Sequence, residues 1–168
     1  MTYKNKTYIA FDGDTDIEYY RTLQMWKENK NIDFDFYDAH DLNTARDTSL
    51  TESIKNQLRE RFENSKLFMI IVGDKTKDNR KFIPWEIEQA LERNLPIIVI
   101  YINHSRHIDT TVCPLPLHQA LAIHIPFKLA IIQYAYKYWP SSHDKYQKGG
   151  EKGPYYYVAE TYEQLGLG

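Results

Sequence analysis

The chain has 168 residues and a formal net charge of −2, a length that fits one α/β domain with a short extension. The charge gives no basic excess for neutralising phosphates, so nucleic acid is not expected as the main partner. A single cysteine, Cys113, excludes an internal disulfide framework and cysteine-based zinc clusters. The polar start and the lack of an apolar run of about 20 residues predict a soluble cytoplasmic protein, with neither signal peptide nor membrane span.

The first forty residues predict a strand, a helix and a second strand. Residues 8–11 are apolar and predict the first strand. The acidic segment 12–16 is typical of a turn that also caps a helix, because Asp and Thr side chains accept hydrogen bonds from free backbone N–H groups. We expect this helix over residues 17–30. Residues 33–38 begin with polar–apolar alternation, which predicts a half-exposed strand at or near a sheet edge.

The middle of the chain carries the clearest pattern. After a polar loop, Ser49 and Glu52 have the spacing of a capping box, and the apolar residues that follow recur every four positions as far as Phe62, which predicts an amphipathic helix. The uninterrupted apolar runs 67–72 and 97–102 are typical of central parallel strands covered on both faces. Such β-α-β order favours right-handed crossovers and an α/β three-layer sandwich with a central parallel sheet.

The helix between these two strands contains the residue of most interest, Glu86. The helix opens at Ile83, and its apolar residues share one side. Glu86 borders that stripe, whereas Glu88 and Glu92 face solvent. Because ligands of α/β sheets bind at the carboxyl ends of the strands, Glu86 is the acidic residue most suited to line a cleft, although favouring the helix N-terminus is an alternative role. Trp85 lies on the polar side, where it either covers the loop 74–82 or contacts a ligand or subunit.

Patterns weaken after residue 103. We expect a loop at 104–111, a non-helical Cys-Pro-Leu-Pro segment at 113–116 and a strand at 120–125. A helix at 127–139 and a polar, glycine-containing mobile segment at 141–154 are expected to follow. Residues 155–165 are expected to form a final helix, with a strand as the alternative. The predicted division is a domain at 1–140 and an extension at 141–168. Eight of the 14 tyrosines fall between Tyr134 and Tyr162. They indicate either an extension packed on the domain or a self-association surface.

Several of these segments resemble the bacterial TIR-like domain family, and in particular the TIR (ThsB-type) proteins of the Thoeris antiphage system. The resemblance runs from residue 7 to residue 103 and rests on an ordered set of matches rather than on one short motif. The matching segments are Ile-Ala-Phe-Asp at 9–12, Phe-Tyr-Asp-Ala at 36–39, Ile-Val-Gly-Asp-Lys-Thr at 71–76, Trp-Glu-Ile at 85–87 and Ile-Val-Ile-Tyr-Ile-Asn at 98–103. Ala10 and Asp12 stand where many TIR domains have a Ser-containing pattern.

This resemblance implies a flavodoxin-like/TIR three-layer sandwich and a TIR-type enzyme with NAD+ as its substrate and no further cofactor or metal. Such enzymes cleave the nicotinamide–ribose bond, and Thoeris-type members release a cyclic or conjugated ADP-ribose-derived signal that activates a separate effector protein. Their catalytic glutamate falls on Glu86. Candidate substrate-binding residues are Phe11, Asp12, Asp14, Asp38, Thr76 and Trp85. Core packing is an equal alternative for Phe11, and turn or capping roles are alternatives for the aspartates.

Three other functions fit parts of the sequence. A phosphoreceiver would use Asp12 and Asp14 for Mg²⁺, Asp74 as phosphoryl acceptor and Lys128 as its lysine, but Asp74 comes late and the Lys-Pro order is reversed. A catalytically silent TIR module would assemble through the tyrosines. A flavin is disfavoured because the acidic turn would repel its phosphate. His104 and His107 are spaced by three in a loop without a partnered carboxylate, so no zinc site is expected.

Overall fold

The computed structural model describes residues 7–13, 15–32 and 52–168. The strand predicted at 33–38 and the cap at Ser49 lie outside these ranges, as do the candidate residues Asp14 and Asp38. Within the described part, five parallel strands form one sheet in the order β1-β2-β3-β4-β5. Their bounds are Thr7–Ala10, Leu67–Val72, Ile97–Tyr101, Ala122–Pro126 and Pro154–Tyr155.

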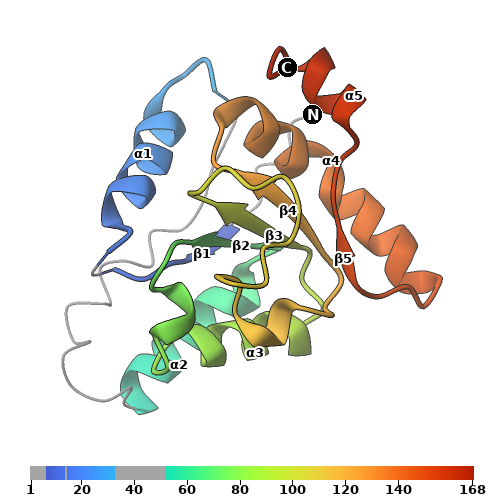
Figure 1. Cartoon of the computed structure of the whole chain (residues 1–168). Coiled ribbons are helices and arrows are strands. Elements are labelled where there is room, and N and C mark those ends of the chain that lie inside the picture. Colours follow the sequence, from blue (N-terminus) through green and yellow to red (C-terminus); the bar gives the residue numbers. More distant parts are fainter. Residues whose placement is uncertain (1–6, 14, 33–51) are drawn as a thin grey trace.

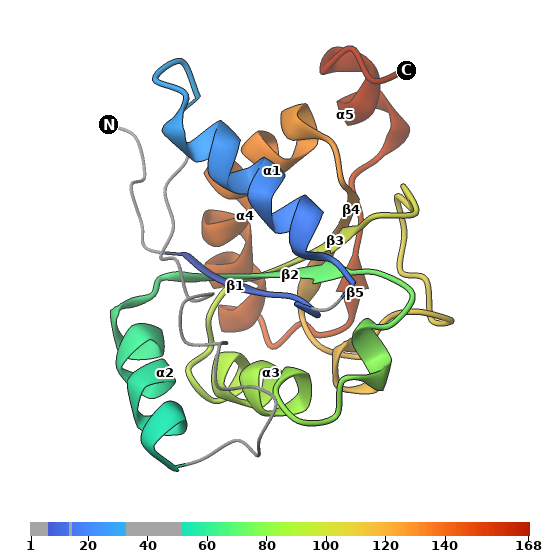
Figure 2. The same ribbon diagram turned by 90° about the vertical axis from the view of Figure 1, so that its left-hand side faces the viewer.

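Helices cover both faces of this sheet, as Figures 1 and 2 show. One face packs on α1 (Ile17–Glu28) and α4 (Leu129–Lys148), and the other packs on α2 (Glu52–Asn64) and α3 (Ile83–Glu92). The strands β2 and β3 are buried along their whole length, which fits apolar runs covered on both sides. The predicted α/β three-layer sandwich with a central parallel sheet is therefore confirmed.

Side chains alternate between the two cores along each strand. Tyr8 and Ala10 of β1 face α2 and α3, whereas Ile9 faces α1 and α4. The same period of two along β2 and β3 supplies apolar side chains to both cores. This alternation matters for the site because it decides on which face of the sheet each residue near Glu86 lies.

The C-terminal third differs from the sequence prediction in two places. The segment 141–154 was expected to be a mobile loop, but α4 continues through Pro140 to Lys148 and only 149–153 connects it to β5. The predicted boundary between residues 140 and 141 consequently lies inside α4. The final segment contains both of the alternatives, because the two-residue strand β5 pairs with β4 and α5 (Ala159–Gln164) follows it.

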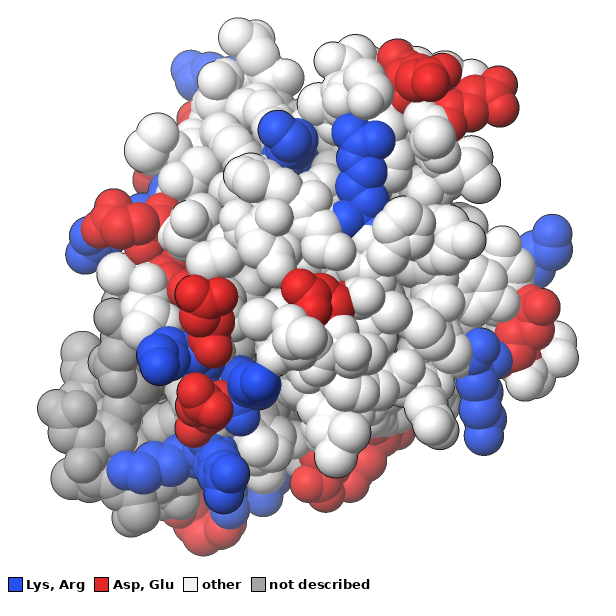
Figure 3. Space-filling model, viewed as in Figure 1, with Lys and Arg blue, Asp and Glu red and all other residues white. Residues whose placement is uncertain are grey.

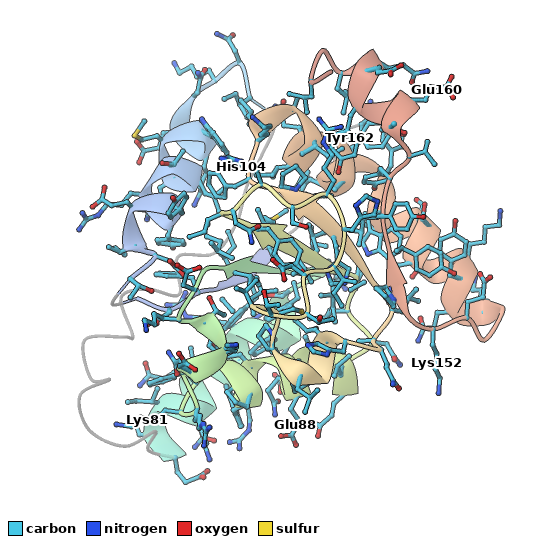
Figure 4. The ribbon with its side chains drawn as sticks, in the orientation of Figure 1. Lys81, Glu88, His104, Lys152, Glu160 and Tyr162 are labelled. Atoms are coloured by element: carbon cyan, nitrogen blue, oxygen red, sulfur yellow. The ribbon has the colours of Figure 1, made fainter. Side chains whose placement is uncertain are left out.

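Aromatic side chains fix the C-terminal segment to the domain. The rings of Tyr146 and Tyr155 stack with centroids 4.6 Å apart, and Trp139 contacts Tyr155 at 5.8 Å. Tyr162 of α5 is fully buried; in Figure 4 it points toward the body of the molecule, whereas Glu160 points outward. Most of these tyrosines therefore serve packing, which is the first of the two roles expected from the sequence.

Candidate active site

Glu86 lies in the first turn of α3, the helix that follows the carboxyl end of β2. Pro84 occupies the start of this helix, where its missing N–H costs no hydrogen bond, and the Glu86 N–H donates to the carbonyl of Phe82 at 2.9 Å. Only 6% of Glu86 is exposed, whereas Glu88 on the same helix projects away from the sheet (Figure 4). The helix thus separates one inward carboxylate from the outward ones, as its apolar period predicts.

The buried carboxylate of Glu86 has a hydrogen-bond donor from the first strand. The hydroxyl of Tyr8 donates to Oε2 of Glu86 at 2.5 Å, across 78 positions of sequence. The strand β1 carries Tyr8 on the face of the sheet that α3 covers. Because an ionised carboxylate is costly to bury without donors, this contact is a main reason why Glu86 can occupy its position.

The helix α2 completes the surroundings of this pair. Its Phe62 stacks on the ring of Tyr8 at 3.8 Å, and the edge of Trp85 meets Phe62 at 6.1 Å. The guanidinium of Arg59 lies 5.7 Å above the Trp85 ring. From the sequence, Trp85 was expected to cover the loop 74–82 or to contact a ligand or subunit. Its half-buried ring joins α3 to α2 through aromatic and cationic partners on that helix, and a ligand contact stays a prediction.

Phe11 belongs to the core of the opposite face. Its side chain is 2% exposed and stacks on Tyr20 of α1 at 4.5 Å. The period of two along the first strand directs Phe11 toward α1, whereas Tyr8 points toward α3. Phe11 thus has the packing of the core alternative, and a role in substrate contact stays a prediction.

A second group of polar residues gathers where β1 and β2 end. Asp12 accepts a hydrogen bond from the Thr15 hydroxyl at 3.3 Å and, through its carbonyl, one from the N–H of Asp16 at 2.8 Å. These are turn contacts of the kind that the sequence left open. The Thr76 hydroxyl is fully buried; it accepts from the N–H of Gly73 at 2.8 Å and lies 3.3 Å from Oδ2 of Asp16. Thr76 therefore braces the turn, and its role in substrate binding stays a prediction.

Asp16 is the unexpected member of this group. It is buried, and its desolvation raises the pKa of the carboxyl, an effect opposed by the Thr76 hydroxyl and reinforced by the nearby Asp12. Its carboxylate lies directly against Gly73, where only a residue without Cβ leaves room. Asp16 thus ties the turn after β1 to the turn after β2, next to the start of the loop that leads to Glu86.

That loop presents charges on the surface. Figure 3 shows acidic and basic side chains side by side over α2 and the loop between β2 and α3. The exposed charged residues of the loop are Asp74, Lys75, Lys77, Asp78, Arg80 and Lys81. Four cations against two anions leave the loop locally positive, an arrangement that favours approach of an anionic molecule.

Beyond β3, a buried polar network anchors the next loop. The Tyr101 hydroxyl lies 2.7 Å from Nδ1 of His124 and accepts a hydrogen bond from the N–H of Asp109 at 3.3 Å. Burial raises the pKa of Tyr101 and lowers the pKa of His124 to about 4. At neutral pH both groups are uncharged, and they hold the loop against the carboxyl ends of β3 and β4.

Residues 7–13, 15–32 and 52–168 contain neither a metal-ligand cluster nor a helix that could span a membrane. No group of three or more His, Cys, Asp or Glu side chains is placed there to hold a metal ion. In the same ranges no helix combines the length and the apolar character that crossing a bilayer requires. Asp74 and Lys128, the receiver-type candidates, are both exposed at their strand ends.

Tyr8 is the functional candidate that the sequence analysis missed. The first strand was predicted, but its partner face was not known, so no pattern linked Tyr8 to Glu86. A weak signal did exist, since a tyrosine in a short buried strand requires a partner for its hydroxyl.

One comparison with known proteins bears on this arrangement. Residues 8–107 match the family described as "Thoeris protein ThsB, TIR-like domain". The match includes β1 from Tyr8 onward and all of α1, α2, β2, α3 and β3, and hence both Tyr8 and Glu86. No curated protein matches the chain.

Proposed function

The chain belongs to the family of the Thoeris protein ThsB, TIR-like domain, and we propose that it is an NAD+-processing enzyme with Glu86 as its catalytic carboxylate. It cleaves the bond between nicotinamide and ribose in the cytoplasm. The remaining ADP-ribose group becomes a cyclic or conjugated signal that acts on a separate effector protein in antiphage defence. NAD+ is a substrate in this proposal, and no further cofactor is involved.

The observation that carries the proposal is the single buried carboxylate in the first turn of α3, held by Tyr8. When the C1′–N bond of NAD+ breaks, its electron pair leaves with neutral nicotinamide and positive charge develops on the ribose. A carboxylate beside the sugar stabilises that charge. Water or a nucleophilic group of the product then bonds to C1′ and releases a proton. Glu86 supplies the negative charge, and the positive loop before α3 suits the pyrophosphate.

A silent interaction module that assembles through tyrosines is the second candidate. Tyr138 and Tyr156 are exposed at 47% and 55%, respectively, so part of the tyrosine-rich surface is available for self-association. Assembly and catalysis are compatible, and self-association accompanies the enzymatic proposal. The receiver alternative has less support, because the family match falls on TIR-like proteins.

The test is nicotinamide release from NAD+ by purified wild type, Glu86→Gln and Glu88→Gln. Both variants remove one negative charge from α3, but only Glu86 is buried. We expect Glu86→Gln to lower kcat by about 100-fold or more and Glu88→Gln to retain wild-type turnover. Equal turnover by all three proteins would contradict the role of Glu86. Folded, assembled wild type without turnover would favour the silent module.

A further inference from the structure

We propose that Tyr8 is the positioning residue of the candidate active site, holding the Glu86 carboxylate in its reactive orientation. This inference rests on the proposed function and adds a second residue to the same site. It starts from the 2.5 Å hydrogen bond between the Tyr8 hydroxyl and Oε2 of Glu86, both within the buried part of the molecule.

The ring of Tyr8 is itself held firmly. It stacks on Phe62 with an interplanar angle of 14° and lies 5.9 Å from Phe68. Phe68 is also the residue that pairs with Tyr8 across the β1–β2 ladder. The position of the hydroxyl is therefore set by strand pairing and by a helix, and a functional group supported by rigid elements keeps its geometry better than one supported by loops.

The carboxylate needs such support because a glutamate side chain has three rotatable bonds. Fixing one oxygen restricts those rotations before substrate arrives, so less order has to be created in the transition state. The hydroxyl donor also favours the ionised form of the carboxylate over the protonated one. Both effects act on Glu86, and Tyr8 takes no part in bond making.

Tyr8 could instead only fill the core, in which case its hydroxyl merely satisfies a buried acceptor. The substitution Tyr8→Phe separates the two roles because it keeps the ring stack on Phe62 and removes only the hydroxyl. Tyr162→Phe is the matched control: the Tyr162 hydroxyl is also buried, and it has no hydrogen-bond partner in the described part of the chain.

We expect Tyr8→Phe to lower kcat for NAD+ cleavage by about 10- to 100-fold with little change in KM, while Tyr162→Phe turns over like wild type. The acidic limb of the kcat–pH profile should move to higher pH in Tyr8→Phe. Wild-type kcat and an unshifted profile in folded Tyr8→Phe would overturn the proposal while leaving the proposed function intact.

A second measurement does not depend on activity. The side-chain carboxyl carbon of Glu86, assigned by its loss in Glu86→Gln, is titrated by NMR in wild type and in Tyr8→Phe. A titration midpoint at higher pH in Tyr8→Phe supports control of the carboxylate by Tyr8. An unchanged or lower midpoint overturns it, even if wild type proves inactive and the proposed function fails.

Discussion

The carboxylate of Asp16 lies against the Cα of Gly73, so that a Cβ added to Gly73 would be 2.6 Å from Oδ1 of Asp16. Real Cβ atoms do not approach an oxygen so closely. Asp16 cannot easily move away, because it is buried and in contact with the Thr76 hydroxyl. This contact joins the turns that follow β1 and β2.

Gly73→Ala is therefore expected to lower the free energy of unfolding by about 1–3 kcal/mol, the usual cost of overpacking. Gly149→Ala is the control, because the nearest atom to its added Cβ is 3.5 Å away and its φ of −80° suits alanine. Urea unfolding of both variants measures the difference. Equal free energies of unfolding for the two variants would show that the Asp16 side chain moves aside without destabilising the protein.

The Tyr101–His124 pair predicts a dependence of stability on pH. Burial, with a smaller effect of His118, lowers the pKa of His124 to about 4 from the ordinary 6.5. Between these values the unfolded chain binds more protons than the folded one, so stability is lost as the pH falls from 6.5 toward 4. We expect wild type to lose more unfolding free energy than His124→Gln between about pH 7 and about pH 5.

Urea titrations of both proteins at several pH values measure this difference. The other titrating groups are common to both proteins and cancel to a first approximation. Parallel stability curves would mean that His124 takes up a proton without destabilising the fold. That result would contradict the predicted effect of its burial.

The contacts of Arg106 with the C-terminal segment are expected to stabilise α5 locally. The guanidinium lies 4.1 Å from the ring centroid of Tyr162, and Nη2 donates to the carbonyl of Leu167 at 3.0 Å. Arg106→Ala should lower the opening free energy of α5 by about 1 kcal/mol, measured by hydrogen exchange of its amides. Lys137→Ala removes a comparable cation over exposed Tyr138 and should leave hydrogen exchange of the α5 amides unchanged. Equal exchange in the two variants would contradict a stabilising role of Arg106.

Local patterns predicted the sheet well where strands are long and apolar. The strands β2 and β3 occur within one residue of the predicted runs, since burial on both faces gives an uninterrupted apolar signal. The start of α3 was also predicted, because Pro84 and the apolar stripe both mark it. The short β5 was predicted only as an alternative to a helix, since two residues carry no period and its pairing with β4 is a tertiary contact.

The extension of α4 past Pro140 shows packing overriding a local signal. A proline normally ends or bends a helix. Here Ala135, Trp139 and His143 are all buried at intervals of four residues, so the helix keeps its inward face by continuing. The apolar stripe seen in the sequence ended at Trp139 only because the next inward residue is a histidine.

The residues of the candidate site also differ in how far local sequence patterns could predict their positions. The inward position of Glu86 follows from the helical period within one segment. The roles of Tyr8, Phe11 and Trp85 depend on which face of the sheet or which neighbouring helix each side chain meets, and these contacts join segments far apart in sequence. For that reason the sequence alone pointed to Glu86, missed Tyr8, and left the two aromatic residues between ligand and core.

The most direct test of the central claim is mass detection of nucleotide products in phage-challenged and unchallenged cells that express wild type or Glu86→Ala. We predict loss of NAD+, release of nicotinamide and an ADP-ribose-derived product in challenged cells with wild type, and none of these with Glu86→Ala at equal amounts of folded protein. Product formation by Glu86→Ala, or no product in challenged cells with wild type, would contradict the catalytic role of Glu86.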